Sequence, residues 1–223
     1  MPILNKAKGK ETIESRILKI EKDAWGRLEE AMSKAGFKED YPKQIILAAF
    51  KEEQILQVYA NDYQGIQLIK EYPFTATSGT LGPKLKEGDK QIPEGIYNVQ
   101  YLNPNSSYYL SIKVDYPNEY DKSKTQFSNL RDMGGDIFIH GKSATIGCIP
   151  IGDKGIEEVF LMTQKAINKK VKVIISPRDF RTNPKFPDIE SIEWEQELYE
   201  SIKNELKTLH NNGYNDHISL RTL

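Results

Sequence analysis

The sequence contains one cysteine and three histidines among 223 residues, and its formal net charge is only −1. One cysteine cannot form an internal disulfide bond, so cysteine usage does not indicate a redox compartment. No apolar run approaches the roughly 20 residues that span a bilayer, and no basic stripe interleaved with aromatic residues favours a nucleic-acid partner. With 38% hydrophobic and 28% charged residues, the composition is that of an ordinary globular protein.

Patterns that would hold a metal ion or a phosphate group are also lacking. His210 and His217 lie far in sequence from His140, and no Cys/His cluster has the spacing of metal ligands. No stretch resembles a calcium loop or a phosphate-binding glycine loop. We therefore expect neither a metal site nor a cofactor.

The stretch 137–151 brings together the cysteine and one of the histidines. An apolar run at 137–139 is typical of a buried strand and places His140 at its end, and Gly147 then precedes Cys148. A cysteine close to a histidine is a candidate nucleophile and base, because the thiolate is the reactive form and an imidazole can generate it. The residues alone leave a second interpretation open, in which Cys148 is a small buried hydrophobic residue and His140 a structural one.

Three ordered motifs favour the catalytic interpretation. His140-Gly141 followed by Thr145-Ile146-Gly147-Cys148 resembles the signature of the L,D-transpeptidase (YkuD-type) catalytic domain. Residues 78–97, which end in Pro-Glu-Gly-Ile-Tyr, resemble a further segment of that family, and residues 115–121 resemble a stretch of its YafK-like branch. Together the motifs cover roughly residues 44–177.

The resemblance implies a thioester mechanism on peptidoglycan stem peptides. Cys148 is the implied nucleophile and His140 its base, and the carbonyl of Gly141 orients the imidazole. The main-chain N–H groups of Gly147 and Cys148 are the natural oxyanion-hole donors, and glycine there lets the peptide approach closely. Ser143 as nucleophile is a distant alternative, because it lacks the Gly-Cys context.

The sequence departs from the family pattern at three points. His140 and Cys148 are only eight positions apart, whereas family members commonly have a longer insertion. Ile146 stands where a histidine or arginine often precedes the Gly-Cys pair. Pro150 replaces an arginine that usually anchors the substrate carboxylate. The candidate substrate-binding residues are Lys84, Arg131, Lys142, Ser143, Thr145 and Tyr116.

The periodicity predicts a mostly-β (α+β) fold, and the resemblance implies a β-sandwich or barrel flanked by amphipathic helices. Predicted helices span 11–36, from an N-cap at Asp153 to 168, and 189–209. Predicted strands span 44–50, 54–60, 66–72, 96–102, 108–114, 137–141 and 171–176, with a turn at 103–107. Residues 75–95 are expected to form a structured loop. Residues 116–135 are expected to form an irregular one, which is either a lid or substrate wall or a plain surface insertion. The expected division is an N-terminal helical extension (1–42), a catalytic domain (43–177) and a C-terminal helical extension (178–223).

Several functions remain open at this point. The resemblance implies a transpeptidase, or a carboxypeptidase or amidase, in the periplasm or cell envelope, although residues 1–10 show no apolar leader segment and one is expected to have been removed. The alternatives are a hydrolase that releases an envelope lipoprotein from the wall, a thiol peptidase acting on ordinary proteins, and an inactive wall-binding module. The oligomeric state is not indicated.

Overall fold

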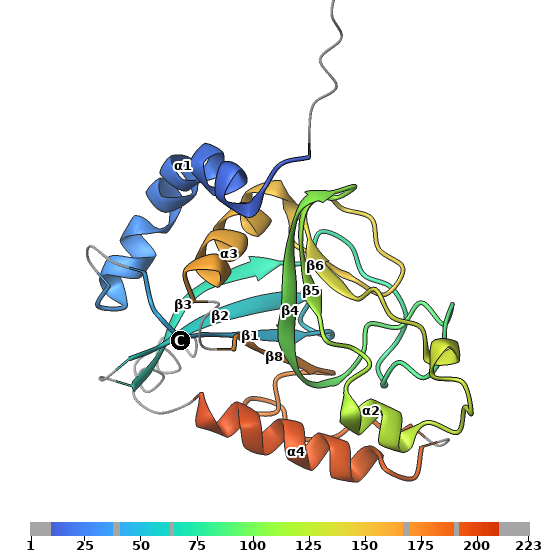
Figure 1. The fold of residues 1–223 in the computed structure, drawn as a ribbon. Helices are drawn as coiled ribbons and strands as arrows, with labels where there is room; N and C mark the ends of the chain where they lie inside the picture. Colours follow the sequence, from blue (N-terminus) through green and yellow to red (C-terminus); the bar gives the residue numbers. More distant parts are fainter. Residues whose placement is uncertain (1–9, 38–40, 63–64, 167–169, 190–191, 210–223) are drawn as a thin grey trace, which may run out of the picture.

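One mixed sheet of eight strands organises the protein, as Figure 1 shows for the computed structural model, which describes residues 10–37, 41–62, 65–166, 170–189 and 192–209. The helical elements are α1 (Ile13–Lys34), α2 (Glu119–Lys124), the 3₁₀ helix η1 (Leu130–Met133), α3 (Gly152–Ala166) and α4 (Glu195–Thr208). The strands are β1 (Ile45–Phe50), β2 (Ile55–Asp62), β3 (Gly65–Pro73), β4 (Gly95–Ser106), β5 (Tyr109–Val114), β6 (Phe138–His140), β7 (Ile149–Pro150) and β8 (Lys172–Ser176). This arrangement confirms the α+β fold.

The strand order β3-β2-β1-β8-β4-β5-β6-β7 makes β4 the link between two parts of the sheet. Residues 95–98 of β4 pair with β8, and from Val99 onward β4 pairs with β5. In Figure 1, β4 and β5 stand upright while β1, β2, β3 and β8 run across, and α3 lies in the angle between them. The second part, β4 to β7, carries the cysteine and histidine motif.

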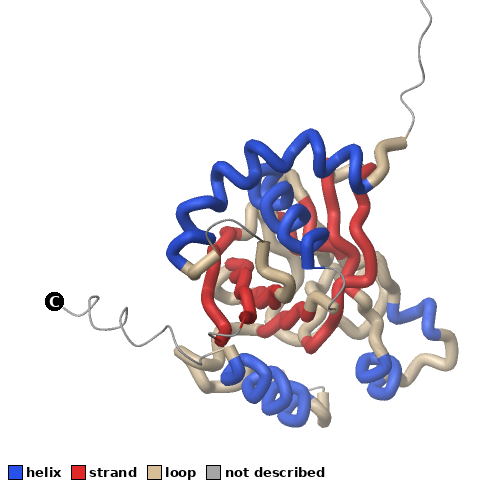
Figure 2. Tube along the Cα trace, turned by 60° about the vertical axis from the view of Figure 1, so that its left-hand side comes forward, coloured by secondary structure: helices blue, strands red, loops and turns tan. Residues whose placement is uncertain are grey.

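The central strand β1 is buried on both faces, as its unbroken apolar run requires. Ile45, Leu47 and Ala49 join the hydrophobic core that also contains the buried residues of α1 and α3. Ile46, Ala48 and Phe50 point to the opposite face and join the cluster under α4. Figure 2 shows the strands between α1 and α3 on one side and α4 on the other. The two expected flanking helices therefore cover opposite faces of the sheet.

Helix α1 is fixed by a cap, an apolar stripe and a buried carboxylate. Its N-cap is Thr12, whose side chain accepts a hydrogen bond from the Ser15 main chain. The buried carboxylate of Glu158 on α3 lies 2.7 Å from Arg27 Nε of α1 and 2.7 Å from Lys70 Nζ of β3. The buried stripe of α1 consists of Ile17, Ile20, Ala24, Leu28 and Met32.

Several predicted elements differ from the structure. Strand β4 continues to Ser106, because Pro104 is accommodated in an irregularity of the β4–β5 pairing, and the predicted turn at 103–107 shortens to residues 107–108. Helix α4 begins at Glu195 and not at 189. The segment 116–135 contains α2, which the side chains of Asn118 and Asp121 cap reciprocally, because these polar residues form a local capping box that the hydrophobic pattern does not reveal. Residue 168, the predicted end of α3, lies outside the described residues.

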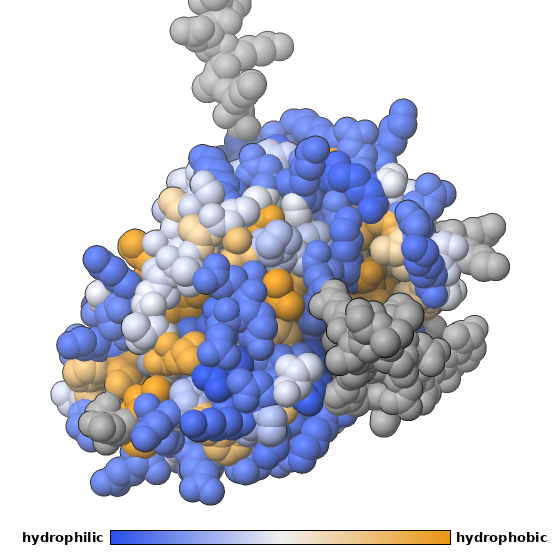
Figure 3. All heavy atoms as spheres, turned by 180° about the vertical axis from the view of Figure 1, so that it is seen from behind, coloured by the Kyte–Doolittle hydropathy of each residue, from blue (hydrophilic) through white to orange (hydrophobic). Residues whose placement is uncertain are grey.

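The described part of the chain contains no helix that is long and apolar enough to cross a membrane. Seen from behind, the surface is mostly hydrophilic, with hydrophobic residues in separate patches (Figure 3).

A buried ion pair ties the end of β1 to the loop before β4. Lys51 Nζ lies 2.8 Å from Glu94 Oε1 and donates to the carbonyls of Gly82 and Ile92, while the Tyr199 hydroxyl of α4 donates to Glu94 Oε2 at 2.8 Å. Both charged side chains are almost completely buried, so each depends on the other for compensation.

We expect Lys51→Met to lower the free energy of unfolding by about 3–5 kcal/mol, because it leaves the Glu94 carboxylate buried without its counter-charge. Urea denaturation followed by circular dichroism measures the loss. The matched control is Lys34→Met, which removes an exposed ion pair with Glu30 and should leave the transition unchanged. Equal effects of the two substitutions would contradict a special role for the buried pair.

Candidate active site

The register of β6 and β7 brings the histidine and the cysteine to one face of the sheet. The two strands are parallel, with Ile139 opposite Ile149 and His140 opposite Pro150. Cys148 comes directly before β7 and therefore stands level with Phe138. Since side chains alternate along a strand, Cys148 projects to the same face as His140, while Ile139 and Ile149 enter the core. The short His-Cys spacing is thus spanned by one tight loop between two paired strands.

His140 is held in one orientation by the main chain. Its Nδ1 lies 2.6 Å from the carbonyl oxygen of Gly141, so Nδ1 carries the proton and Nε2 is the basic nitrogen. The ring of Tyr108, at the tip of the β4–β5 hairpin, lies over the imidazole with 4.4 Å between centroids. Burial lowers the pKa of His140 below its ordinary value of 6.5, and the hydrogen bond to Gly141 acts in the opposite direction. The imidazole is therefore neutral at pH 7.

Gly141 is required by packing. A Cβ at this position would lie 2.6 Å from Asp153 Oδ1 and 2.8 Å from the Tyr108 carbonyl oxygen. Asp153 is not the N-cap predicted from the sequence: α3 begins one residue earlier, at Gly152, and the Asp153 carboxylate instead accepts the Lys142 N–H at 2.8 Å. The aspartate therefore holds the loop that follows His140.

The Thr145 hydroxyl closes the loop around the cysteine. It accepts hydrogen bonds from the N–H groups of Gly147 (3.2 Å) and Cys148 (2.8 Å), and it donates to the Cys148 carbonyl at 2.7 Å. The two N–H groups expected to form the oxyanion hole thus converge on a single oxygen atom in this structure.

The thiol of Cys148 is half-buried and lies at the edge of β6. Its Sγ donates to the Asp136 carbonyl at 3.5 Å. Burial raises the pKa of the Cys148 thiol above its ordinary value, while the main chain of Phe138 and the positive charge of Lys113 lower it. The raised pKa favours the protonated thiol, and a neutral imidazole is the form that can act as a base.

Two of the expected substrate-binding residues have structural roles. Lys84 is buried, and its Nζ pairs with Asp89 at 2.6 Å, which leaves its charge compensated. Tyr116 is 3% exposed, and its hydroxyl lies near the carbonyls of Lys84 and Met133, so its ring cannot stack on a substrate in this structure. Their role in substrate binding stays a prediction, and the charge of Lys84 is among those that lower the pKa of the Cys148 thiol.

The other candidates lie at the surface. Lys142 is exposed, and its Nζ donates to the Ser107 carbonyl at 2.6 Å, which joins the motif loop to the β4–β5 hairpin. Ser143 is exposed on the same loop, and Arg131 is exposed on η1.

A cavity of about 430 Å³ lies beside the cysteine motif and not at it. Its lining comes from three segments, namely 83–91, 124–127 and 192–194, and includes Phe127 and Trp194. It approaches the motif through Gln91. A Cβ added to Gly147 would lie 3.0 Å from the carbonyl oxygen of Gln91. The segment 116–135 therefore forms a cavity wall, but cavity size alone would not identify Cys148.

Among the described residues, no group of three or more His, Cys, Asp and Glu is arranged to hold a metal ion.

Sequence reasoning missed three residues around the pair, namely Tyr108, Lys113 and Asp136. Lys113 meets the motif through sheet pairing and Tyr108 through the hairpin turn, whereas Asp136 directly precedes the motif in the chain. Alternation within residues 109–114 offered a signal for Lys113, since a charged residue between Ile112 and Val114 marks the face opposite the core.

Comparison with known proteins finds one family and two groups of relatives. Residues 43–175 match the family model of the L,D-transpeptidase catalytic domain, YkuD. The chain is 33% identical over 162 residues to the Escherichia coli (strain K12) protein named "Putative L,D-transpeptidase YafK", a match that covers 68% of this chain and 63% of that protein. The chain thus spans less than two thirds of the length of this relative.

Solved structures show the same fold at lower identity. The helical cell shape determining protein Pgp2 from Campylobacter jejuni superposes with a TM-score of 0.50 at 21% identity, covering 76% of this chain and 71% of that one. A K307A mutant of the same protein also gives 0.50, at 24% identity, and covers 76% of this chain and 55% of that one.

We expect iodoacetamide to alkylate Cys148 about ten times faster at pH 8 than at pH 7, because the thiolate is the nucleophile and its pKa is raised. Intact mass against time measures the rate cleanly, since the chain has one cysteine, and Cys148→Ser should take no label. A rate independent of pH over this range would instead indicate a preformed thiolate and imidazolium.

Proposed function

The chain belongs to the L,D-transpeptidase catalytic domain (YkuD) family, and on that premise we propose that it is a cysteine enzyme of acyl transfer on peptidoglycan stem peptides. One observation carries the proposal for Cys148 and His140. The Gly141 carbonyl fixes the proton on Nδ1 of His140 and leaves Nε2 as a base, on the sheet face to which Cys148 projects. A nucleophile and an oriented base on one face are the elements of covalent catalysis.

In the first half-reaction, Nε2 of His140 removes the Cys148 thiol proton as Sγ attacks the carbonyl carbon of the amide between the diamino acid and D-alanine. The tetrahedral intermediate then breaks its C–N bond, and the imidazolium returns the proton to the leaving amine. The product is a thioester on Cys148. Since a main-chain carbonyl orients the imidazole, this unit needs no carboxylate partner.

The oxyanion of the intermediate requires donors that already point toward one place. The N–H groups of Gly147 and Cys148 converge on one place, but the Thr145 hydroxyl occupies it in this structure, so the oxyanion has to replace that hydroxyl as their acceptor. In the proposed mechanism, the oxyanion takes up hydrogen bonds from these groups, and Thr145 keeps the loop in shape through its bond to the Cys148 carbonyl.

In the second half-reaction, an acceptor amine or water attacks the thioester. His140 takes the proton of the attacking group, the C–S bond breaks, and Cys148 recovers its proton. An amine gives transpeptidation and water gives carboxypeptidase or amidase activity. Release of a wall-linked lipoprotein is the same chemistry with a different leaving amine, and we hold it as the alternative within this class.

We place the catalytic domain at residues 43–177, with helical extensions at 1–42 and 178–223, and we propose that it works in the periplasm or cell envelope. The family match at 43–175 supports the limits of the domain. The location follows from the proposed substrate.

Incubation with purified tetrapeptide muropeptides tests the proposal. We expect a mass increase of the wild-type protein that corresponds to a thioester, together with released D-alanine, and neither for Cys148→Ala. Intact-mass spectrometry detects the adduct and chromatography identifies the products, which separate water from amine as acceptor. Retained binding to wall sacculi without any turnover, on these muropeptides or on lipoprotein-bearing sacculi, would instead support a wall-binding module.

The Thr145 hydroxyl gives a second test. We expect Thr145→Val, which keeps the shape but loses the hydroxyl, to lower kcat tenfold or more, because the two N–H groups lose their common partner and their direction. Thr145→Ser keeps the hydroxyl and should stay within a few-fold of the wild type. Equal rates for the valine and serine variants, measured as D-alanine release, would show that the hydroxyl is dispensable.

A further inference from the structure

The aromatic ring of Tyr108 covers the imidazole of His140. The two ring centroids lie 4.4 Å apart, and the ring planes are inclined by 37°. Tyr108 is 40% exposed whereas His140 is 1% exposed, so the tyrosine ring stands between the imidazole and solvent. The face of an aromatic ring attracts a cation within about 6 Å of its centroid, because that face is electrically negative. The contact therefore favours the charged form of the imidazole over the neutral form.

A charge on His140 develops during the proposed reaction. In the resting protein the imidazole is neutral, because burial lowers the pKa of His140. Proton transfer from Cys148 in the first half-reaction turns the imidazole into an imidazolium beneath the Tyr108 ring. A contact that is stronger in this state than in the resting protein lowers the barrier to the reaction. The ring is thus placed to act through the histidine.

Charged and titratable side chains face His140 from several elements. They are Lys113 of β5, Asp136 before β6, Cys148 before β7, Lys142 of the motif loop and Asp153 of α3. None of them is a cause of the lowered pKa of His140, which results from burial and, in the opposite direction, from the hydrogen bond to Gly141. Beside the Gly141 carbonyl, the Tyr108 ring is therefore the described group that favours the imidazolium.

The motif loop holds the hairpin tip that carries Tyr108. Lys142 Nζ donates to the Ser107 carbonyl at 2.6 Å. The Tyr108 carbonyl packs against Gly141, where a Cβ would lie only 2.8 Å away. The Gly141 N–H donates to the Leu110 carbonyl at 3.2 Å. The tip and the loop after His140 are therefore fixed to each other on this side.

Residues 11–16, at the start of α1, hold the other side of the tip. Arg16 donates to the Pro104 carbonyl from Nε at 3.3 Å and from Nη2 at 3.0 Å, and its guanidinium lies over the Tyr109 ring. The Glu11 N–H donates to the Asn105 side-chain oxygen at 2.8 Å, and the Asn105 side-chain nitrogen donates to the Glu11 carbonyl at 2.7 Å. The helix thus contacts the residues that lead into the turn.

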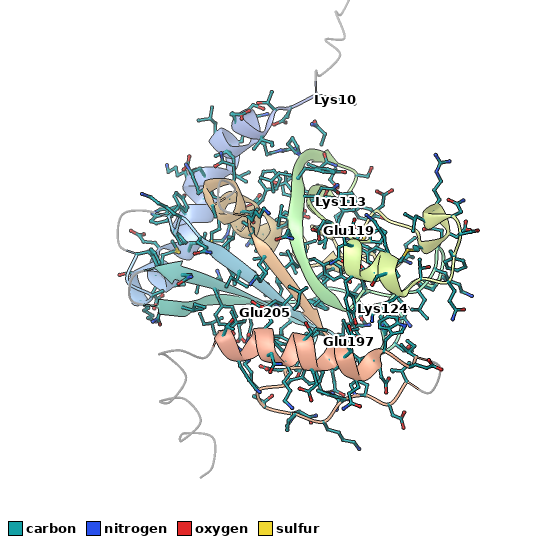
Figure 4. The ribbon with its side chains drawn as sticks, turned by 60° about the horizontal axis from the view of Figure 1, so that its bottom comes forward. Lys10, Lys113, Glu119, Lys124, Glu197 and Glu205 are labelled. Carbon is teal, nitrogen blue, oxygen red and sulfur yellow. The ribbon has the colours of Figure 1, made fainter. Side chains whose placement is uncertain are left out.

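Figure 4 labels Lys10, which precedes Glu11, near the tip of this hairpin, and Lys113 farther along it. Helix α1 lies outside residues 43–175, which match the family model. The hold on the hairpin therefore comes from outside the matched catalytic domain.

We propose that Tyr108 is a positioning residue that stabilises the imidazolium of His140 during proton transfer, and that residues 11–16 hold its hairpin over the site. The part of the imidazolium in turnover rests on the proposed function. The contact between the ring and the imidazole can be measured without any substrate.

An NMR titration of the His140 imidazole tests the ring. Tyr108→Leu keeps the imidazole covered but has no aromatic face, so we expect the pKa of His140 to fall below its wild-type value. Tyr108→Phe keeps the face and should retain the wild-type value. His140→Gln identifies the signal among the three histidines of the chain. An equal or higher pKa in Tyr108→Leu would overturn the stabilisation.

Turnover of the tetrapeptide muropeptides separates positioning from substrate contact. Tyr108→Leu should lower kcat about threefold or more with little change in KM, and Tyr108→Phe should stay close to the wild type. A higher KM with unchanged kcat would mean that the ring binds substrate, and it would contradict the positioning role. If the wild type turns over none of the peptides, the proposed function fails, and the NMR titration still decides on the ring.

Arg16→Met tests the hold on the hairpin, because it removes both hydrogen bonds to the Pro104 carbonyl and keeps a long apolar side chain. We expect it to change the pKa of His140 when residue 108 is tyrosine and to leave it unchanged in Tyr108→Leu, since its effect passes through the ring. Lys34→Met removes the same charge from the last turn of α1 and should change neither value. Equal changes in the two backgrounds, or no change in either, would overturn the hold.

Discussion

The buried ion pair between Lys51 and Glu94 ties the end of β1 to the loop that precedes β4 and packs against Gly147. Lys51 also donates to the carbonyls of Gly82 and Ile92, so one ammonium contacts the middle and the end of the loop that precedes β4. The residue before Ile92 is Gln91, whose carbonyl packs against Gly147 where a Cβ would come within 3.0 Å. Gly147 has a φ of 127°, a conformation that favours glycine. A core interaction on β1 thereby limits the backbone next to the cysteine.

The main chain does most of the positioning at the candidate site. The Gly141 carbonyl sets the histidine tautomer, and the Asp136 carbonyl accepts a hydrogen bond from the Cys148 thiol. The N–H groups of residues 147 and 148 both donate to the Thr145 hydroxyl. These groups are held by strand pairing and loop closure, and in the proposed mechanism the two N–H groups exchange the Thr145 hydroxyl for the oxyanion. This explains how a site can be preorganised although its histidine has no carboxylate partner, and why small residues are required at 141 and 147.

Elements could be predicted from the sequence where one hydrophobic pattern dominates. The prediction failed where local polar contacts determine where an element begins or ends. The apolar stripe of α1 and the alternation in β2 and β5 were sufficient to place those elements. The capping box at Asn118 and the continuation of β4 past Pro104 depend on hydrogen bonds that no periodicity displays. At the site, the motif identified Cys148, His140 and Gly141, whereas the burial of Lys84 and Tyr116 depends on tertiary contacts with Asp89 and two carbonyl groups.

Lys113 shows why sheet register, and not proximity in sequence, determines what surrounds the cysteine. It lies 35 positions before Cys148 in the chain, yet it stands opposite Phe138, with which Cys148 is level, because β5 pairs with β6 in one register. A slip of one residue would turn Ile112 to the catalytic face and bury Lys113 in the core, at the cost of an uncompensated charge. The apolar residues that fill the core from β5 therefore also fix the lysine beside the thiol. Stability of the fold and composition of the catalytic face are consequences of the same alternation.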